Sequence, residues 1–410
     1  MKVSSFLLLV SLLTFTSLSF SQTSDTSSKL KFYLACENCD FDFIRKEISF
    51  VDYVRDPAQA DVHCFVVRES AGNGGARYSF IFLGLHQFSG VNDTLQLLNK
   101  VEATQDEFRS GTVRVLTLGL TRYVSHTSQA SELTVSCKVA DSAVSPTVDS
   151  WDSWIFALDI NSNINLEQQH GYYNYYAGIS ANRTTPDWKI RTNSYLSYTE
   201  NKFDDLGIKS LSRSSSFEGL VVRSLTDHWS TGPSVTLGSN TYRNRKFLAE
   251  GSWGLEYDIF PYSESTARQL RILYKLGANK YNYFDTTIYD KVSELVGSQV
   301  LSASLVLQQS WGTAELTVAG SQYLHDLSQT EFNVFTNMQL RLFEGLSLRI
   351  YGNYAAIHDQ IFLPKTGLSN DEVLLQLHQL KTNYAFYTSL GLTYTFGSIY
   401  NNVVNPRFGN

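Results

Sequence analysis

The sequence predicts a mostly β protein, a 12-stranded antiparallel transmembrane β-barrel preceded by a small α/β domain. Between residues 151 and 397, apolar and polar residues alternate over runs of about ten residues, which is the period of a strand. The chain has 24 Tyr, 25 Phe and 6 Trp but only 7 Pro, a composition that favours β-structure. After the first 21 residues no stretch approaches the roughly 18 apolar residues of a membrane-spanning helix, so such a helix is excluded.

The clearest strand pair covers residues 247–259 and 270–279. One face of both strands is apolar and ends in aromatic residues, as expected of a surface that contacts lipid. The other face carries acids on the first strand and bases on the second, namely Glu250, Glu256 and Asp258, then Arg271 and Lys275. Charged residues of this kind require water or a polar lumen, so the pair has the pattern of a transmembrane β-hairpin.

Residues 1–21 have the features of a secretory signal peptide. Lys2 precedes an apolar run at 6–15, and Ser19-Phe20-Ser21 forms a small-x-small cleavage pattern, which predicts a cut between Ser21 and Gln22. A lipoprotein would need a cysteine directly after the apolar run, whereas the first cysteine is Cys36. We therefore expect export across the inner membrane.

Residues 29–127 are predicted to form a periplasmic α/β domain. Strands are expected at 31–36, 49–54, 61–67, 77–85 and 94–98, and helices at 42–48 and 107–123. This order predicts a sheet with both helices on one side. Residues 128–150 are interpreted as a linker with one strand near 133–139.

Residues 151–398 are predicted to form the barrel, and residues 399–410 a C-terminal tail in the periplasm or the lumen. The twelve expected strands are 154–163, 172–182, 188–198, 217–225, 234–242, 247–260, 269–281, 300–309, 312–321, 332–342, 346–356 and 384–396. An even strand number suits a closed bacterial barrel, and closure leaves no strand edge facing lipid. Long outer loops are expected at 202–214, 284–297 and 357–382, the last with helical character at 371–380; short inner turns are expected at 184–187, 309–311 and 343–345.

Several motifs resemble an uncharacterised family of outer-membrane β-barrel proteins of Gram-negative bacteria. They are Cys36-x-x-Cys39-Asp40, Tyr53-Val54-Arg55-Asp56 and Ala60-Asp61-Val62-His63 in the first domain, then Trp151-Asp152-x-Trp154, Asp187-Trp188-Lys189, Phe260-Pro261-Tyr262 and Tyr394-Thr395-Phe396-Gly397-Ser398. The first domain is also similar, in element order, to the N-terminal domain of the periplasmic protein TolB. The final strand resembles the signal that barrel-assembly machinery recognises. The resemblance implies an outer-membrane location with the first domain in the periplasm, and it implies no particular activity.

The four cysteines leave several pairings open. Cys36 and Cys39 form a C-x-x-C in a compartment that favours disulfides. A structural disulfide is expected, within this pair or to Cys64 or Cys137. Redox chemistry, metal binding and free thiols are the alternatives, although no second C-x-x-C or His pair has metal-site spacing.

No catalytic signature is found in the sequence. The eight His residues are scattered, there is no G-x-S-x-G, and the glycines at 72–75 lack the Lys-Ser/Thr of a P-loop. The net charge of −6 and the lack of a basic cluster also disfavour a nucleic-acid partner. We therefore predict a protein that is not an enzyme and needs no cofactor or metal.

The best functional candidates are the polar residues that alternation directs into the barrel. They are Lys189, Arg191, Asn193, Glu250, Glu256, Asp258, Arg271, Lys275, Glu315, Asn337, Arg341, Arg349 and Asn353. They could hold a narrow barrel together as cross-strand ion pairs, or line a path for a solute. Two functions follow: a channel or transporter for small polar solutes with residues 357–382 as its lid, or a non-transporting anchor or assembly factor whose α/β domain docks a periplasmic protein.

Overall fold

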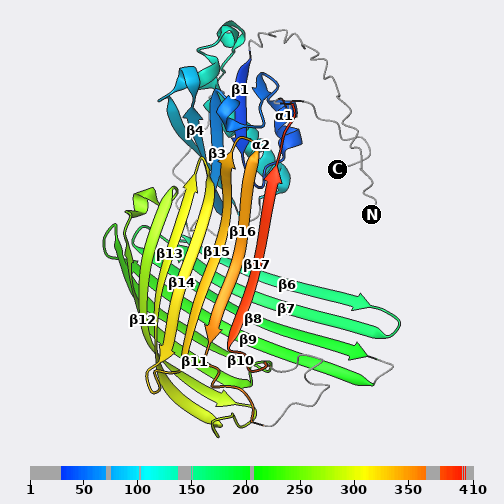
Figure 1. The fold of residues 1–410 in the computed structure, drawn as a ribbon, viewed down its shortest axis with the longest axis vertical. Helices are drawn as coiled ribbons and strands as arrows, with labels where there is room; N and C mark the ends of the chain where they lie inside the picture. Colours follow the sequence, from blue (N-terminus) through cyan, green and yellow to red (C-terminus); the bar gives the residue numbers. More distant parts are fainter. Residues whose placement is uncertain are drawn as a thin grey trace, which may run out of the picture.

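The computed structural model describes residues 29–70, 75–100, 103–136, 149, 151–203, 207–365, 379–398, 400 and 402. The predicted signal peptide lies outside these residues. The chain forms a five-stranded sheet in the order β2-β1-β3-β4-β5 and a twelve-stranded sheet in sequence order from β6 to β17. Figure 1 shows the smaller sheet at one end of the larger one, above β15 to β17. We call this end of the large sheet the near end and the opposite end the far end.

The first domain has the element order that the sequence predicts. Its elements are β1 (Leu30–Ala35), α1 (Phe41–Glu47), β2 (Val51–Tyr53), β3 (Val62–Ser70), β4 (Ala76–Gly84), β5 (Asn92–Asn99) and α2 (Gln105–Val124). β1 pairs in parallel with β2 and β3, whereas β3–β4 and β4–β5 are antiparallel. The sheet is therefore mixed.

Local sequence sets the helix boundaries. The carboxylate of Asp40 accepts a hydrogen bond from the Phe43 amide and caps α1, and Thr104 with Glu107 forms a capping box at α2. The alternate strand residues that face the helices, such as Phe32, Phe80 and Phe82, are fully buried. No helix in the described part of the chain is long and apolar enough to span a membrane.

The strand predicted near 133–139 is wrong for the residues that the structure describes. Ser128–Glu132 forms a 3-10 turn, and residues 133–136 are irregular. The Gln129 side chain donates to the Phe50 carbonyl, and Leu133 packs against the domain core. The segment thus stays on the domain, and the remainder of the predicted strand lies outside the described residues.

All twelve predicted strands of the large sheet are present, and every neighbouring pair is antiparallel. They are β6 (Trp154–Leu166), β7 (His170–Thr184), β8 (Trp188–Phe203), β9 (Ile208–Ser224), β10 (Trp229–Asn240), β11 (Arg245–Asp258), β12 (Arg268–Tyr283), β13 (Ser293–Gln309), β14 (Gly312–Tyr323), β15 (Thr330–Phe343), β16 (Leu346–Ile357) and β17 (Tyr384–Tyr394). The three predicted short turns all lie at the near end.

Two of the predicted outer loops are shorter than expected. β8 and β9 remain paired as far as Phe203 and Ile208, and β13 already begins at Ser293. The added segments are polar, so the alternation of apolar and polar residues ends before the backbone hydrogen bonds between the strands do. Lys209, for example, lies 3.0 Å from the carboxylate of Glu200 across the ladder and continues the pairing with an ion pair.

The predicted closure of the barrel is not present in this structure. β6 and β17 are the two edges of the sheet and do not pair with each other, and Figure 1 shows β6 to β9 diverging from β17. All residues of β17 are exposed, both those that point to the convex face and those that point to the concave face. Alternation specifies which face of a strand is apolar, but it contains no information about whether the first and last strands meet.

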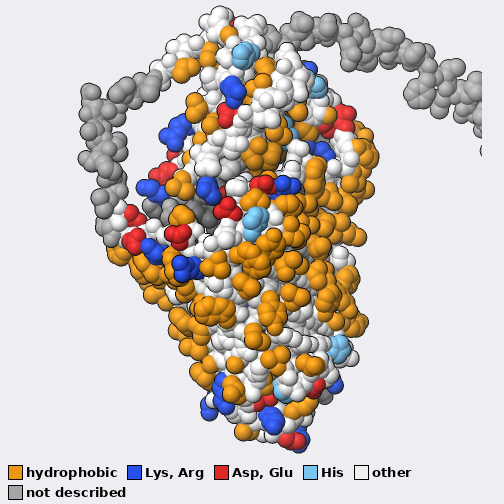
Figure 2. Space-filling view, turned by 90° about the vertical axis from the view of Figure 1, so that its left-hand side faces the viewer, with side chains coloured by type: hydrophobic (Ala, Val, Ile, Leu, Met, Phe, Trp, Pro, Cys, Tyr) orange, Lys and Arg blue, Asp and Glu red, His pale blue; other side chains and the backbone are white. Residues whose placement is uncertain are grey.

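The convex face of the large sheet is an extensive apolar surface. Its exposed side chains include Leu158, Ile179, Leu196, Trp253, Leu276 and Leu301. Figure 2 shows this surface as a belt of hydrophobic side chains, with charged side chains gathered at the far tip and around the domain. An exposed apolar surface of this extent is typical of contact with a membrane or with another protein.

Candidate functional site

The concave face of the sheet contains a polar cavity of about 380 Å³ toward its far end. β10 to β14 supply most of its walls, with hydroxyl groups from Ser234, Thr236, Ser252, Ser298 and Ser321. Five charged side chains also line it: Arg243, Arg245, Glu250, Lys275 and Asp359. The cavity therefore combines cations, anions and hydrogen-bonding groups within one small volume.

Strand registry brings these groups together. Glu250 and Ser252 are two residues apart on β11 and point to the same face. Their partners on β12 are Asn279 and Gly277, which also line the cavity. A side chain at Gly277 would meet the Gly251 carbonyl oxygen at 2.6 Å, so the glycine permits the close approach of β11 and β12 in this part of the wall.

An inward loop closes the cavity toward the far end. After β16 the chain turns back into the curved sheet, where Ile361, Phe362 and Leu363 are buried against Tyr281, Tyr283, Val296 and Tyr323. We call residues 358–365 the inward loop. Its apolar cluster lies inside an otherwise polar interior and narrows it.

Asn244 fixes the inward loop in place. Its side-chain amide donates to the carbonyl oxygens of Asp285, at 2.9 Å, and Phe362, at 3.0 Å, and its oxygen accepts from the Asp285 amide at 2.8 Å. The residue is almost fully buried and has a φ of 54°, a left-handed conformation that asparagine adopts more readily than most residues. Asn244 thus joins the β10–β11 turn, the β12–β13 connection and the inward loop.

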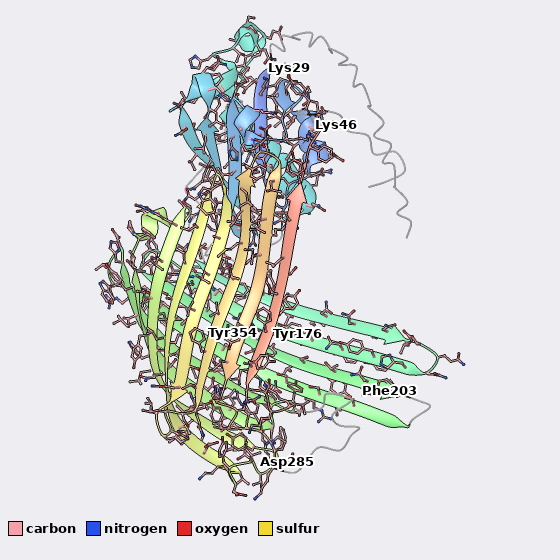
Figure 3. The ribbon with its side chains drawn as sticks, in the orientation of Figure 1. Lys29, Lys46, Tyr176, Phe203, Asp285 and Tyr354 are labelled. Carbon is pink, nitrogen blue, oxygen red and sulfur yellow. A yellow bond between two sulfur atoms is a disulfide. The ribbon has the colours of Figure 1, made fainter. Side chains whose placement is uncertain are left out.

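Backbone pairing adds further anchors between the inward loop and the β12–β13 connection. The Ile288 amide donates to the Leu363 carbonyl at 2.9 Å, and the Lys365 amide donates to the Thr286 carbonyl at 2.8 Å. The Lys365 ammonium group also forms an ion pair with Asp290. Figure 3 labels Asp285, in this connection, at the far end of the sheet.

Arg245 connects the inward loop with the cavity. Its guanidinium carbon lies 4.9 Å from the ring centre of Tyr281 and 4.8 Å from that of Phe362, within the range of cation–π contacts. The Tyr281 hydroxyl donates in turn to the Glu250 carboxylate at 2.8 Å. The charge of the cavity wall and the position of the inward loop are therefore coupled through one arginine and one tyrosine.

The structure brings only two of the predicted lumen-lining residues, Glu250 and Lys275, into this cavity. Strand registry places others on the same concave face but away from the cavity, namely Lys189, Arg191, Asn193, Glu256, Arg271, Glu315, Asn337, Arg349 and Asn353. Among these described residues, no ion pair joins the acids of β11 to the bases of β12.

Two predicted lumen-lining residues have other partners. The carboxylate of Asp258, which is almost fully buried, accepts from the amides of Phe260, at 3.4 Å, and Leu270, at 3.1 Å, so it stabilises the β11–β12 turn. Arg341 lies at the near end, with its guanidinium carbon 4.9 Å from the Tyr33 ring centre of the first domain. Asp258 and Arg341 both lie near the end of a strand, so their side chains contact a turn and the first domain instead of the lumen.

Sequence reasoning missed Arg243, Arg245, Tyr281 and Asp359. Arg243 lies in the β10–β11 turn and Arg245 begins β11, whereas Tyr281 lies at the far end of β12 and Asp359 in the inward loop. The available signal was the apolar triplet at 361–363, which is unusual within a long loop exposed to water.

The first domain is docked on the near end through the β15–β16 turn. The carboxylate of Asp56 accepts from the Gly345 amide at 3.0 Å, and the Gln59 amide donates to the Glu344 carboxylate at 2.7 Å. Arg341 also donates a hydrogen bond to the Tyr33 hydroxyl. Asp56 and Gln59 lie in the connection between β2 and β3, and Tyr33 lies on β1, on the face opposite to the buried Phe32.

The chain after β17 also joins the first domain. Val54 and Tyr400 form an antiparallel bridge, and the side chain of Asn402 accepts from the Tyr53 amide at 2.6 Å and donates to Asp52 at 2.9 Å. Arg55 donates to the Phe396 carbonyl at 3.3 Å. The described part of the predicted tail therefore lies against β2 and not in the lumen.

We expect acid to weaken the docking of the first domain. His63 is buried beside Tyr33, and burial, aided by the Arg341 charge, lowers its pKa from 6.5 to about 4. Because the docked state disfavours the protonated ring, stability is complete above about pH 6.5 and falls as the pH drops toward 4. The protection factors of the β1 and β3 amides, which are corrected for the pH dependence of the intrinsic exchange rate, should be several-fold lower at pH 4.5 than at pH 7.5.

The control for this prediction is His63→Phe, which keeps an aromatic ring but cannot be protonated. Its protection factors in β1 and β3 should change far less between the two pH values. An equal acid response in the variant would assign the effect to other groups.

The cysteines form one disulfide in the described residues. Cys36 and Cys39 are bonded, and Cys64 is a buried free thiol whose pKa is raised by burial. Cys137 lies outside the described residues. Within the part of the chain that the structure describes, no group of three His, Cys, Asp or Glu side chains is arranged to hold a metal ion.

Comparison with known proteins gives little further information. No family model and no curated protein matches this sequence. Among solved structures, the chain is similar to the NanC porin in a rhombohedral crystal form, with 11% identity over 58% of this chain and 100% of that chain and a TM-score of 0.29. So low a TM-score supports no conclusion, and the functional argument depends on the geometry described above.

Proposed function

We propose that this chain is an outer-membrane β-barrel channel for small polar solutes, with its first domain in the periplasm. The observation that carries the proposal is a charged cavity on the concave face of a sheet whose convex face is apolar and exposed. A membrane barrel needs this division, with an apolar band toward lipid and polar groups toward the lumen. The sequence motifs that resemble a family of outer-membrane barrel proteins, such as Phe260-Pro261-Tyr262, support the same location.

The arrangement at the far end favours a restricted channel. The inward loop occupies the space beside the cavity, and Arg245 lies between the loop and the cavity. A solute on this path would meet Arg243, Arg245 and Lys275 together with Glu250 and Asp359. The mixture of charges suits a small solute with several hydrogen-bonding groups better than a large apolar one.

The orientation follows from the connections. The shortest turns, β13–β14 and β15–β16, lie at the near end with the first domain, as expected for the periplasmic side of a bacterial barrel. The longest connection lies at the far end, which is then extracellular. Barrel-assembly machinery would insert the strands, since the last strand carries an alternating pattern that ends on aromatic residues.

The alternative function is an anchor or assembly factor that docks a periplasmic partner. One observation favours it: β5 is an unpaired edge of the small sheet and exposes Leu98. Crosslinking in intact envelopes followed by purification tests this alternative. Failure to recover a stoichiometric periplasmic protein would count against it.

Conductance of the purified full chain in planar bilayers tests the channel proposal. We expect discrete conductance steps, and Lys275→Glu should shift the ion preference toward cations because it places a third acid in the cavity wall. Lys46→Glu, an identical charge change on exposed α1 of the first domain, is the control. Absence of conductance, both for the full chain and after removal of residues 29–150, would refute a channel.

A further inference from the structure

A second cavity lies on the convex face of the large sheet, opposite the face that carries the polar cavity. It is a groove of about 610 Å³ that crosses β6 to β11. Its floor and walls are outward-facing apolar side chains, including Leu158, Ile179, Leu196, Phe217, Leu237 and Phe247. The volume is within the roughly 300–1,000 Å³ typical of ligand sites.

Small residues create the groove. Ala177, Ser194 and Ser215 face outward on three successive strands, between the larger side chains of their neighbours. On β9, Gly219 also faces outward, and a side chain there would approach Val235 to 3.1 Å. A flat lipid-facing surface would carry large apolar residues at these positions, so the depression is a property of the sequence.

The far end of the groove is polar and positively charged. Ser239 and Lys246 line it there, and the register shift between Arg245 and Phe247 places Lys246 at the rim. Arg213 precedes the groove residue Ser215 by two positions and so faces the same side; its amide donates to Thr241 at 3.0 Å. The rim therefore has two cations above an apolar channel.

These two cations have no acidic partner within 4.0 Å among the residues that the structure describes. The nearby carboxylate of Glu200 is already paired with Lys202, at 3.5 Å, and Lys209, at 3.0 Å. Lys246 and Arg213 are thus available for an anion at the far end. A rim of cations next to an apolar groove matches a molecule that carries an anionic group on an acyl chain.

We propose that the groove binds a phospholipid of net negative charge in the outer leaflet, with one acyl chain along the apolar floor and the anionic headgroup against Lys246 and Arg213. The proposal rests on the proposed membrane location and orientation, because the far end must lie at the level of the outer lipid headgroups. Long basic side chains reach such headgroups readily from the edge of the apolar band. A second copy of the chain is the other possible occupant.

Native mass spectrometry of the full chain tests the proposal. The protein is released from micelles that contain either dioleoyl phosphatidylglycerol or dioleoyl phosphatidylcholine, two lipids with the same chains but different net charge. We expect one retained phosphatidylglycerol and weaker retention of phosphatidylcholine. The double variant Lys246→Ala/Arg213→Ala should reduce phosphatidylglycerol retention about 30-fold, the contribution expected of two cations near an anionic lipid surface.

Two further variants separate the parts of the site. Ala177→Trp fills the groove and should reduce retention of both lipids, whereas Lys46→Ala/Arg114→Ala removes two exposed cations from the first domain and should change neither. Equal retention of both lipids by the unmodified protein, or unchanged retention by Lys246→Ala/Arg213→Ala, would overturn the proposal. A dimer mass without bound lipid would assign the groove to a second copy.

Conductance of the same preparations separates this inference from the proposed function. If conductance is normal but no lipid is retained, only the lipid site is refuted. If conductance is absent while phosphatidylglycerol is retained and the double variant loses it, the lipid site stands without the channel. If neither conductance nor lipid retention is observed, the membrane location on which both proposals depend is refuted.

Discussion

Asn244→Ala is expected to increase the single-channel conductance by releasing the inward loop. The substitution removes three buried hydrogen bonds that join the loop to the β10–β11 turn and the β12–β13 connection. Each such bond contributes about 1 kcal/mol. Alanine at a φ of 54° adds roughly 1 kcal/mol of strain. The sum, about 4 kcal/mol, is large enough to shift the loop to a mainly released state.

Asn244→Gly separates the two contributions, because glycine adopts this φ without strain. Its conductance should lie between that of the unmodified protein and that of Asn244→Ala. Lys365→Met, which removes only the exposed ion pair with Asp290, should have a much smaller effect, since exposed pairs contribute at most about 1 kcal/mol. Planar-bilayer recordings of the three variants measure the order.

Unchanged conductance in Asn244→Ala, in protein with a normal content of β-structure, would show that the inward loop does not limit the path. A decrease would indicate that the released loop obstructs the lumen. Either result would contradict the proposal that the inward loop restricts the channel.

The strands were predictable because period-two alternation is a local property. Every expected strand of the large sheet is found, and the strand pair of β11 and β12 has the predicted inward set of Glu250 and Lys275. The predicted strand ends are wrong where the apolar pattern stops before the backbone hydrogen bonds between the strands do, as at the far ends of β8 and β9. There, polar residues such as Lys202 and Lys209 continue the ladder without an apolar pattern.

The candidate site was less predictable than the strands because it depends on a fold-back. Ile361 and Phe362 are buried by distant residues of β12 and β14, and no periodicity in the loop indicates which ones. Asn244 belongs to a short turn whose sequence gives no sign of a buried anchor. In contacts of this kind, one side chain bonds to backbone groups that are distant in the sequence, and no sequence pattern marks those groups.

Docking of the first domain was unpredictable for the same reason. Asp56 accepts from the backbone of Gly345, and Asn402 bonds both the backbone and the side chain of β2 residues. A backbone amide has no sequence signature. The residues that bind it can be recognised only after the turn has been placed.

In the outer-membrane form proposed above, β6 and β17 are expected to pair with each other and close the sheet. In the structure both are free edges, and each carries a row of unpaired backbone groups between apolar side chains. Each such group costs several kcal/mol in lipid, so pairing the two edges would recover tens of kcal/mol. With twelve antiparallel strands, β6 and β17 run in opposite directions, as an antiparallel closing pair requires.

Engineered disulfides measure this closure. Asp159→Cys on β6 is combined in turn with Ser389→Cys, Gly391→Cys and Thr393→Cys on β17, all on inward positions, in a background with Cys64 and Cys137 changed to serine. Because the closing register is unknown, one of the three pairs is expected to crosslink efficiently, since disulfides need Cα atoms within about 7 Å. Asp159→Cys with Ser304→Cys on distant β13 is the control and should stay reduced.

The pattern of products distinguishes a closed barrel from other ways of covering the edges. An intramolecular crosslink in membranes, absent in the control pair, establishes that β6 and β17 are neighbours and that the channel has a continuous wall. Crosslinked dimers would instead mean that each edge pairs with a second copy, and the lumen would then belong to an assembly of two chains. No crosslink in any of the three pairs would show that β6 and β17 are not neighbours in these registers and would count against closure by this pair of strands.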